Sequence, residues 1–140
     1  MAYKTFFTPK NTKKYIGNLN TIYCRSLWER RMCRYLDENI KIIRWGFEPI
    51  HIPYFSPIDH KMHKYIPDFI VETQNIDKKK EITILEIKPL KQTKDPSTKK
   101  RKRLDECLTY SINRAKWDAA LLYCAEHGWG FKIITEKELF

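Results

Sequence analysis

The spacing of apolar residues predicts a helix soon after the start of the chain. Four apolar residues recur at helical spacing on one face of this segment: Trp28, Met32, Tyr35 and Leu36. Ser26 is a typical N-cap residue, and Glu29 follows it three positions later, as in a capping box. We therefore expect a first helix over residues 27–38. Residues 1–23 show no clear period, which favours an irregular arm.

A second, longer helix is predicted from about residue 104 to Gly128, a residue type that ends helices. Its apolar positions step by four, four, three, four and three residues: Leu104, Leu108, Ile112, Ala115, Ala119 and Leu122. We expect this stripe to face the core. The segment WGFKIIT then predicts a last strand. Thr135 with Glu138 repeats the capping-box pattern and predicts a terminal helical turn.

The middle of the chain is rich in β-branched and aromatic residues, which favours strands. The segment IKIIRWGFEPIHIPYF predicts one or two strands, and SPIDH predicts a turn. HKYIPDFIVE and EITILEIK predict a hairpin around the polar residues 75–80, and Pro89 ends its second strand. This order predicts one α/β (α+β) domain over residues 1–140, with a mixed sheet flanked by helices.

Two acids interrupt the apolar pattern of the predicted hairpin. Residues of EITILEIK are apolar on both faces, which indicates a central strand, but Glu86 and Lys88 project together from one face near its end. Asp68 shares its face of the preceding strand with isoleucines. If Thr73 pairs with Glu81, Asp68 lies opposite Glu86, with Cβ atoms roughly 5 Å apart.

Two carboxylates so close raise each other's pKa unless a cation lies between them. Mg²⁺, or alternatively Mn²⁺, suits such hard oxygen ligands, and it can activate water and neutralise charge on a phosphodiester. Lys88 could then position the water or support the developing oxyanion. In the alternative interpretation, Asp68 and Glu86 form purely structural ion pairs with Lys88 and Lys64.

The charge of the chain favours a nucleic-acid partner. Lys and Arg outnumber Asp and Glu by 27 to 17, which gives +10. Residues 78–103 hold eleven basic residues against three acidic ones, a net +8, so most of the excess lies there. Seven residues of this stretch are the expected contacts to double-stranded DNA: Lys91, Lys94, Lys99, Lys100, Arg101, Lys102 and Arg103. A solvated loop is the alternative.

Several other functions find no support in the sequence. The four cysteines form no CxxC pair, which favours reduced core thiols over a zinc site. Asp59, His60 and His63 lie in a predicted turn without helical spacing, so we expect surface histidines rather than metal ligands. The sequence shows no Gly-rich phosphate loop and no apolar run long enough for a membrane span, and its first residues do not combine a basic region, an apolar stretch and a small-residue cleavage site. We expect a soluble protein that is not secreted and does not enter a membrane.

Pro67 and Asp68 followed by Glu86, Ile87 and Lys88 resemble the PD-(D/E)XK nuclease motif. The order of predicted elements also resembles the restriction-endonuclease-like core of that superfamily. Further segments resemble its TnsA-like branch and the head completion nucleases of T-even-type phages: PKNTKKYIG, RSLWERR, IPYFSPIDHKMHKYIPDF, LEIKP, AKWDAA and GWGFKIITEKEL. The resemblance implies catalytic Asp68, Glu86 and Lys88, with Glu29 as a third acid at the metal. Glu29 could equally be only a helix cap.

The resemblance also implies a biological setting. It suggests a magnesium-dependent DNA nuclease that acts on packaged DNA during head completion, before head–tail joining, in the virion or the host cytoplasm. Its partners would then include head, portal or neck proteins of the phage. Two alternatives remain at this point: a DNA-binding virion assembly protein without activity, and a branched-DNA resolvase of the same fold, which would need a dimer. The oligomeric state and the form of the DNA substrate stay open.

Overall fold

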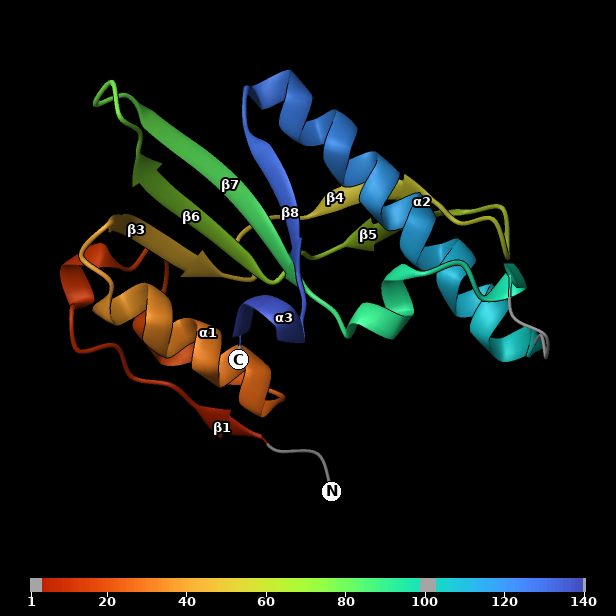
Figure 1. Ribbon diagram of the computed structural model, residues 1–140, viewed down its shortest axis with the longest axis horizontal. Helices are drawn as coiled ribbons and strands as arrows, with labels where there is room; N and C mark the ends of the chain where they lie inside the picture. The colour runs from red at the N-terminus through yellow and green to blue at the C-terminus, as the bar shows by residue number, and fades with distance from the viewer. Residues whose placement is uncertain (1–3, 99–102, 140) are drawn as a thin grey trace.

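A mixed four-stranded sheet forms the centre of the protein, and the computed structural model describes residues 4–98 and 103–139 (Figure 1). Its strands, in spatial order, are β3 (Ile42–Phe47), β6 (Phe69–Gln74), β7 (Lys80–Ile87) and β8 (Gly130–Ile134). The β3–β6 and β6–β7 pairs are antiparallel, and β8 joins β7 in parallel. A parallel neighbour requires a crossover connection, and α2 (Leu104–His127) provides it. The predicted fold class is confirmed.

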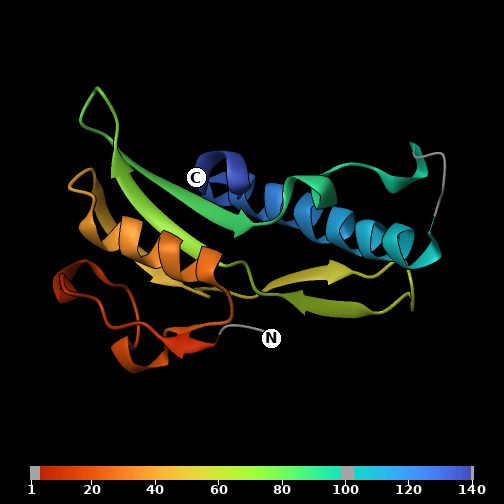
Figure 2. The same ribbon diagram turned by 60° about the horizontal axis from the view of Figure 1, so that its bottom comes forward.

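Helices cover both faces of this sheet (Figure 2). On one face, α1 (Leu27–Glu38) and the short α3 (Glu136–Leu139) pack over side chains from all four strands. On the other face, α2 packs against Phe131 and Ile133 of β8. The central strand β7 is therefore buried from both sides, as its continuous apolar pattern predicted.

The first helix has the predicted bounds and the predicted cap. The Ser26 hydroxyl accepts a hydrogen bond from the Glu29 backbone N–H at 3.1 Å. Met32, Cys33 and Leu36 are buried on the inner face of α1. The cap fixes where α1 begins, and this start lies beside the end of β7 (Figure 2).

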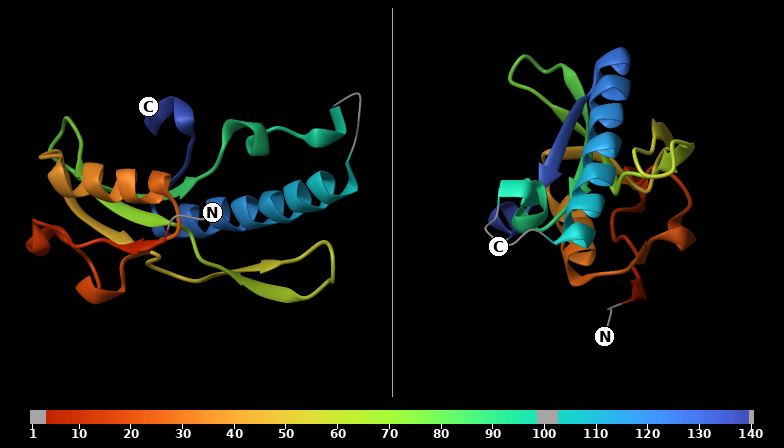
Figure 3. Two further views of the ribbon diagram at one scale, coloured as in Figure 1. Left: turned by 90° about the horizontal axis from the view of Figure 1, so that it is seen from below. Right: turned by 90° about the vertical axis from the view of Figure 1, so that its right-hand side faces the viewer.

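The second helix ends at Gly128 as predicted, with φ at +71°, but only half of the predicted apolar stripe faces the core. Ile112, Ala115 and Ala119 are partly buried and pack against it. Leu104, Leu108 and Leu122 are exposed, and the buried row consists of Asn113, Trp117, Ala120 and Cys124. The reason is geometric. The first half of α2 extends past the sheet, so the large Trp117 and the small Ala120, where α2 meets the strands, decide which face is buried (Figure 3).

The segment HKYIPDFIVE forms two strands instead of the single strand that was predicted. β5 (Met62–Tyr65) pairs with β4 (Ile52–Phe55) in a two-stranded ribbon, whereas β6 belongs to the central sheet. Pro67 lies in the break, where its missing N–H cannot serve a sheet. The ribbon runs alongside α2 (Figure 3), so Tyr65 and the following Asp68 belong to different layers of the protein.

The N-terminal arm is irregular over most of its length, as predicted, although β1 (Thr5–Phe6) and β2 (Tyr23–Cys24) pair briefly within it. The arm crosses β3, where the Ile16 N–H donates to the Trp45 carbonyl at 2.7 Å. Gly46 allows this close approach, because a Cβ there would meet the Ile16 carbonyl oxygen at 2.9 Å.

The remaining expectations from composition concern thiols and membranes. All four cysteines are free, as predicted, and three of them are buried: Cys24, Cys33 and Cys124. No helix within the described ranges is both long and apolar enough to span a lipid bilayer.

Candidate functional site

The hairpin register brings Asp68 and Glu86 to the same end of the sheet. Thr73 pairs with Glu81 as predicted, and pairing continues to Phe69 opposite Leu85. Asp68 lies one residue beyond this pair, and its Oδ2 accepts the backbone N–H of Ile87 at 2.8 Å. A pocket of about 510 Å³ opens here, and both acids line it.

Glu86 is almost completely buried, with 6% of its surface exposed. The Lys88 ammonium lies 4.0 Å from its Oε1, and the Tyr65 hydroxyl donates a hydrogen bond to its Oε2. Lys88 follows two residues later on the same strand face, as the alternation predicted. Lys64, the other cation of the structural ion-pair alternative, is exposed on β5.

Burial makes both acids hard to ionise. It raises the pKa of Asp68 well above its usual range, and the nearby Glu86 carboxylate raises it further. Burial likewise raises the pKa of Glu86, while the Tyr65 hydrogen bond and the Lys88 charge oppose that shift. Ionising both carboxylates in this pocket therefore costs free energy that a bound cation would offset.

Glu29 reaches the same pocket from the first turn of α1. Its Oε1 accepts the Arg25 backbone N–H at 3.2 Å, so the side chain does help to cap the helix start. Burial raises its pKa, and the Glu48 carboxylate contributes to that shift. The first turn of α1 thus points one further acid at Asp68 and Glu86, and capping and pocket lining coexist.

The fit of the pocket to a metal rests on its oxygen atoms. Asp68 and Glu86 each tie one oxygen to a protein donor, Ile87 N–H and Tyr65 hydroxyl respectively. Over residues 4–98 and 103–139, no three His, Cys, Asp or Glu side chains form a group that could hold an ion. Mg²⁺ commonly takes only one or two carboxylates and completes its shell with water and phosphate oxygens. The residues present fit such a site.

Sequence reasoning missed Glu48, which forms an ion pair with the pocket residue Arg25. Glu48 follows β3 with φ at +48°, an unusual conformation for this residue type. Its N–H donates to the Asp68 carbonyl at 2.8 Å and so extends the β3–β6 pairing to the site. No local pattern predicts Glu48 at this place, because only the sheet register brings it beside Asp68.

Sequence reasoning also missed Tyr65 and Lys116. The Lys116 ammonium lies 5.8 Å from the ring centroids of both Tyr54 and Tyr65, and it is half-buried. Burial lowers its pKa, as does the neighbouring charge of Lys88. A hydroxyl from the ribbon and an ammonium from α2 thus approach Glu86. The alternation along one strand cannot reveal neighbours that come from another layer.

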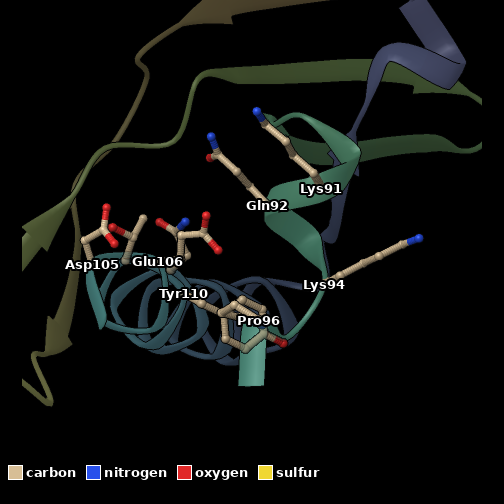
Figure 4. A pocket seen from close by; sticks show the side chains of 9 residues that line it. Lys91, Gln92, Lys94, Pro96, Asp105, Glu106 and Tyr110 are labelled. Atoms are coloured by element: carbon tan, nitrogen blue, oxygen red, sulfur yellow. The ribbon is translucent and has the colours of Figure 1, made fainter. Parts of the chain in front are cut away.

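The basic segment that follows Lys88 contains two short 3-10 helices, Leu90–Thr93 and Pro96–Thr98. It faces the first turns of α2 across a pocket of about 250 Å³ that Lys91, Lys94, Asp105 and Glu106 help to line, with the Lys94 side chain extending away from the two acids (Figure 4). Arg103 pairs with Asp105 at 3.6 Å. Four of the predicted DNA contacts lie outside the described residues: Lys99, Lys100, Arg101 and Lys102.

The histidine-containing turn stands apart from this site. His63 Nε2 and Asp59 Oδ2 lie 2.7 Å apart, and both side chains are exposed, as is His60. The expectation of surface histidines is confirmed.

Comparison with known proteins now adds to the geometry. Residues 39–136 match the family model described as TnsA-like endonuclease N terminal. The chain is also 36% identical to the head completion nuclease of Enterobacteria phage T4, over 99% of this chain and 95% of the phage protein. The matched range includes Asp68, Glu86 and Lys88. The chain therefore belongs to the TnsA-like endonuclease family.

Proposed function

We propose that the protein is a DNA nuclease that depends on Mg²⁺ or Mn²⁺. One observation carries the proposal: two carboxylates, the half-buried Asp68 and the buried Glu86, line one pocket beside Lys88 in a basic chain of an endonuclease family. The Lys88 ammonium lies 4.0 Å from Glu86 Oε1. The Arg25 guanidinium lines the same pocket, but its ion pair is with Glu48. Such a pair is costly unless it binds a cation.

The position of each residue in the pocket indicates its proposed role. A divalent ion, when bound, supplies charge to stabilise the transition state of phosphodiester hydrolysis. Asp68 and Glu86 hold it, and Glu29 adds negative charge from the first turn of α1. Lys88, which shares the strand face of Glu86, orients the attacking water or supports the phosphoryl oxygens. The pocket opens at the end of the sheet, where a DNA strand can approach.

The basic segment after Lys88 is the proposed DNA-binding element. It follows Lys88 directly in the chain, so DNA phosphates bound by Lys91 and Lys94 would place the adjoining part of the DNA strand over the pocket. Lys99–Arg103 are proposed to add further phosphate contacts. Contacts of this type carry affinity without reading sequence, so we propose cleavage with little sequence preference.

The biological setting is proposed from the relative. The T4 protein is named a head completion nuclease, and the two chains match over nearly their whole lengths. We place this protein likewise in a tailed phage, acting on packaged DNA during head completion and before head–tail joining. Its partners would then be head, portal or neck proteins, and its site of action the virion or host cell.

Cleavage of supercoiled plasmid tests the activity. Wild type should nick or linearise the plasmid with Mg²⁺ and should stop when EDTA is added. Asp68→Ala and Glu86→Ala should fail, whereas Asp59→Ala, which removes an exposed acid far from the pocket, should cleave normally. If wild type nicks no DNA with either Mg²⁺ or Mn²⁺, a non-enzymatic DNA-binding assembly protein becomes the better interpretation.

Salt dependence tests the DNA surface separately. Neutral replacements of Lys99–Arg103 should weaken DNA binding. They should also flatten the plot of log binding constant against log salt concentration, by about one unit of slope for each lost phosphate contact. Replacement of the three exposed lysines 78–80, in the hairpin loop and at the start of β7, is a control that should leave the slope unchanged. An unchanged slope in the first variant would move the DNA surface elsewhere.

A further inference from the structure

We infer that Tyr65 is a positioning residue for Glu86, and that Lys116 holds the Tyr65 ring in place for that role. The inference rests on the proposed function, because it takes Glu86 as a metal ligand. It links the site to two elements outside the sheet, the β4–β5 ribbon and α2.

The Tyr65 hydroxyl meets Glu86 in a buried setting. Tyr65 is 4% exposed, and its hydroxyl donates to Glu86 Oε2. A carboxylate oxygen that accepts a buried hydroxyl is fixed in direction, because few other donors can replace that bond. Oε1 is then the oxygen that remains on the Lys88 side, 4.0 Å from its ammonium. Tyr65 thus selects which oxygen of Glu86 is presented to the pocket.

Lys116 fixes the ring that carries this hydroxyl. Its ammonium lies 5.8 Å from the centroids of both Tyr54 and Tyr65, within the range of a cation–π interaction. Tyr54 and Tyr65 lie on paired strands of the ribbon, and Ile52 is the direct partner of Tyr65. The lysine therefore bridges α2 to both strands. Its partly buried charge is costly, which argues that it does more than pack.

The arrangement makes a distinction that can be tested. If Tyr65 and Lys116 only pack the ribbon against α2, their loss should lower stability and leave metal binding unchanged. If Tyr65 orients Glu86, loss of the hydroxyl alone should weaken metal binding, because partners that hold a metal ligand typically contribute 10- to 100-fold in affinity or activity.

The first measurement is Mn²⁺ binding to the full-length protein without DNA, monitored by electron paramagnetic resonance. Tyr65→Phe removes one oxygen atom and should weaken Mn²⁺ binding about tenfold or more. Tyr54→Phe is the matched control, because Tyr54 has the same distance to Lys116 but does not donate to Glu86. Equal affinities for wild type and Tyr65→Phe, with both folded by circular dichroism, would overturn the inference.

A double-mutant cycle tests the role of Lys116. Its charge has its own effect on a nearby divalent ion, but that effect should be similar with and without the Tyr65 hydroxyl. If Lys116 acts through Tyr65, the factor by which Lys116→Met changes Mn²⁺ affinity should differ between the wild-type and the Tyr65→Phe backgrounds. We expect the two factors to differ at least about threefold. Lys116→Arg should restore the wild-type affinity. If the effects of Lys116→Met and Tyr65→Phe on Mn²⁺ affinity are additive, Lys116 does not act through Tyr65.

Plasmid cleavage at saturating Mn²⁺ separates this inference from the proposed function. An inactive wild type that still binds Mn²⁺ would remove the proposed nuclease but leave the positioning of Glu86 measurable. An active wild type with unchanged Mn²⁺ binding in Tyr65→Phe would remove the inference and leave the nuclease. Arg114→Met removes a charge from the exposed side of α2 and should change neither Mn²⁺ binding nor plasmid cleavage.

Discussion

The two ends of α1 both bring acids into contact with distant parts of the chain, but they do so in different ways. At its C-terminal end, Asp37 is 1% exposed, and its two oxygens accept the backbone N–H groups of Lys10 and Asn11 at 2.9 and 3.1 Å. At its N-terminal end, Glu29 faces Asp68 and Glu86 across a pocket of about 510 Å³.

The two ends of α1 differ in how far the hydrogen-bonding capacity of the carboxylates is satisfied by protein donors. Both oxygens of Asp37 are bonded to backbone donors, so this carboxylate fastens the N-terminal arm. Glu72 of β6 is also a structural acid, but through an ion pair: Arg44 Nε lies 2.6 Å from its Oε2. Asp68 and Glu86 each receive a single direct hydrogen bond from a protein donor, and burial raises the pKa of both. Satisfied acids stabilise the fold, whereas under-satisfied acids form a candidate binding site.

The largest expected effect is the loss of cleavage in Asp68→Asn. Asparagine keeps the shape of the side chain and can still accept the Ile87 N–H, but it lacks the charge that holds a divalent ion. We expect plasmid cleavage to fall by about 10³-fold or more, with the fold intact by circular dichroism. Glu72→Gln, on the same strand, should cleave at nearly the wild-type rate. Equal losses in both variants would erase the contrast between the two kinds of acid.

Asp37→Asn should show the opposite behaviour. The amide can replace only part of the carboxylate's acceptor capacity, so one backbone N–H of the arm loses its partner. We expect the free energy of unfolding to fall by about 1–3 kcal/mol in urea titrations. The cleavage rate at low temperature, where the variant remains folded, should stay within about twofold of wild type. A rate loss as large as that of Asp68→Asn would refute a purely structural role.

The comparison also shows what could be predicted from the sequence. The bounds of α1, the Thr73–Glu81 register and the shared strand face of Glu86 and Lys88 follow from local patterns, and the structure confirms them. Caps and alternation act between near neighbours in the chain. They therefore leave a signal in the sequence itself.

Other features depended on contacts between layers and were missed. The buried face of α2 is set by where Trp117 meets the strands, and the exposed leucines of its first half misled the periodicity. Tyr65 reaches Glu86 only because the chain breaks at Pro67 and β5 leaves the sheet. No spacing rule along one strand includes such a break.

Glu29 can be tested as an intermediate case between the two kinds of acid. Glu29→Gln retains an oxygen that can accept the Arg25 N–H, so the cap survives while the charge is lost. We expect cleavage to fall about tenfold, less than for Asp68→Asn, because Glu29 only adds to the charge that the other two acids supply. Ser26→Ala removes the cap hydroxyl instead and should cost about 1 kcal/mol of stability with little effect on rate.

The smallest expected effect concerns stability and pH without metal. The pKa of Asp68 is raised in the folded state, so ionising it favours unfolding. The stability that its protonated form contributes is complete below the unfolded-state pKa of about 4 and is lost as pH rises through the raised folded value. Asp68→Asn should therefore melt above wild type at pH 8, by about 4 °C if the difference is near 1 kcal/mol.

The difference in melting temperature between Asp68→Asn and wild type should vanish below about pH 3, where both side chains are neutral in the folded and the unfolded state. It should shrink or reverse at pH 8 when Mn²⁺ is added, because only wild type binds the ion tightly. A variant that melts below wild type at pH 8 without metal would mean that Asp68, like Asp37, stabilises the fold.

The most direct test of the central claim is an anomalous difference map from a crystal of the wild-type protein soaked in Mn²⁺. The account predicts a strong peak within coordination distance of both Asp68 and Glu86, on the Oε1 side of Glu86. No peak there at millimolar Mn²⁺, or a peak only at the exposed Asp59–His63 pair, would contradict a metal centre at the end of the hairpin.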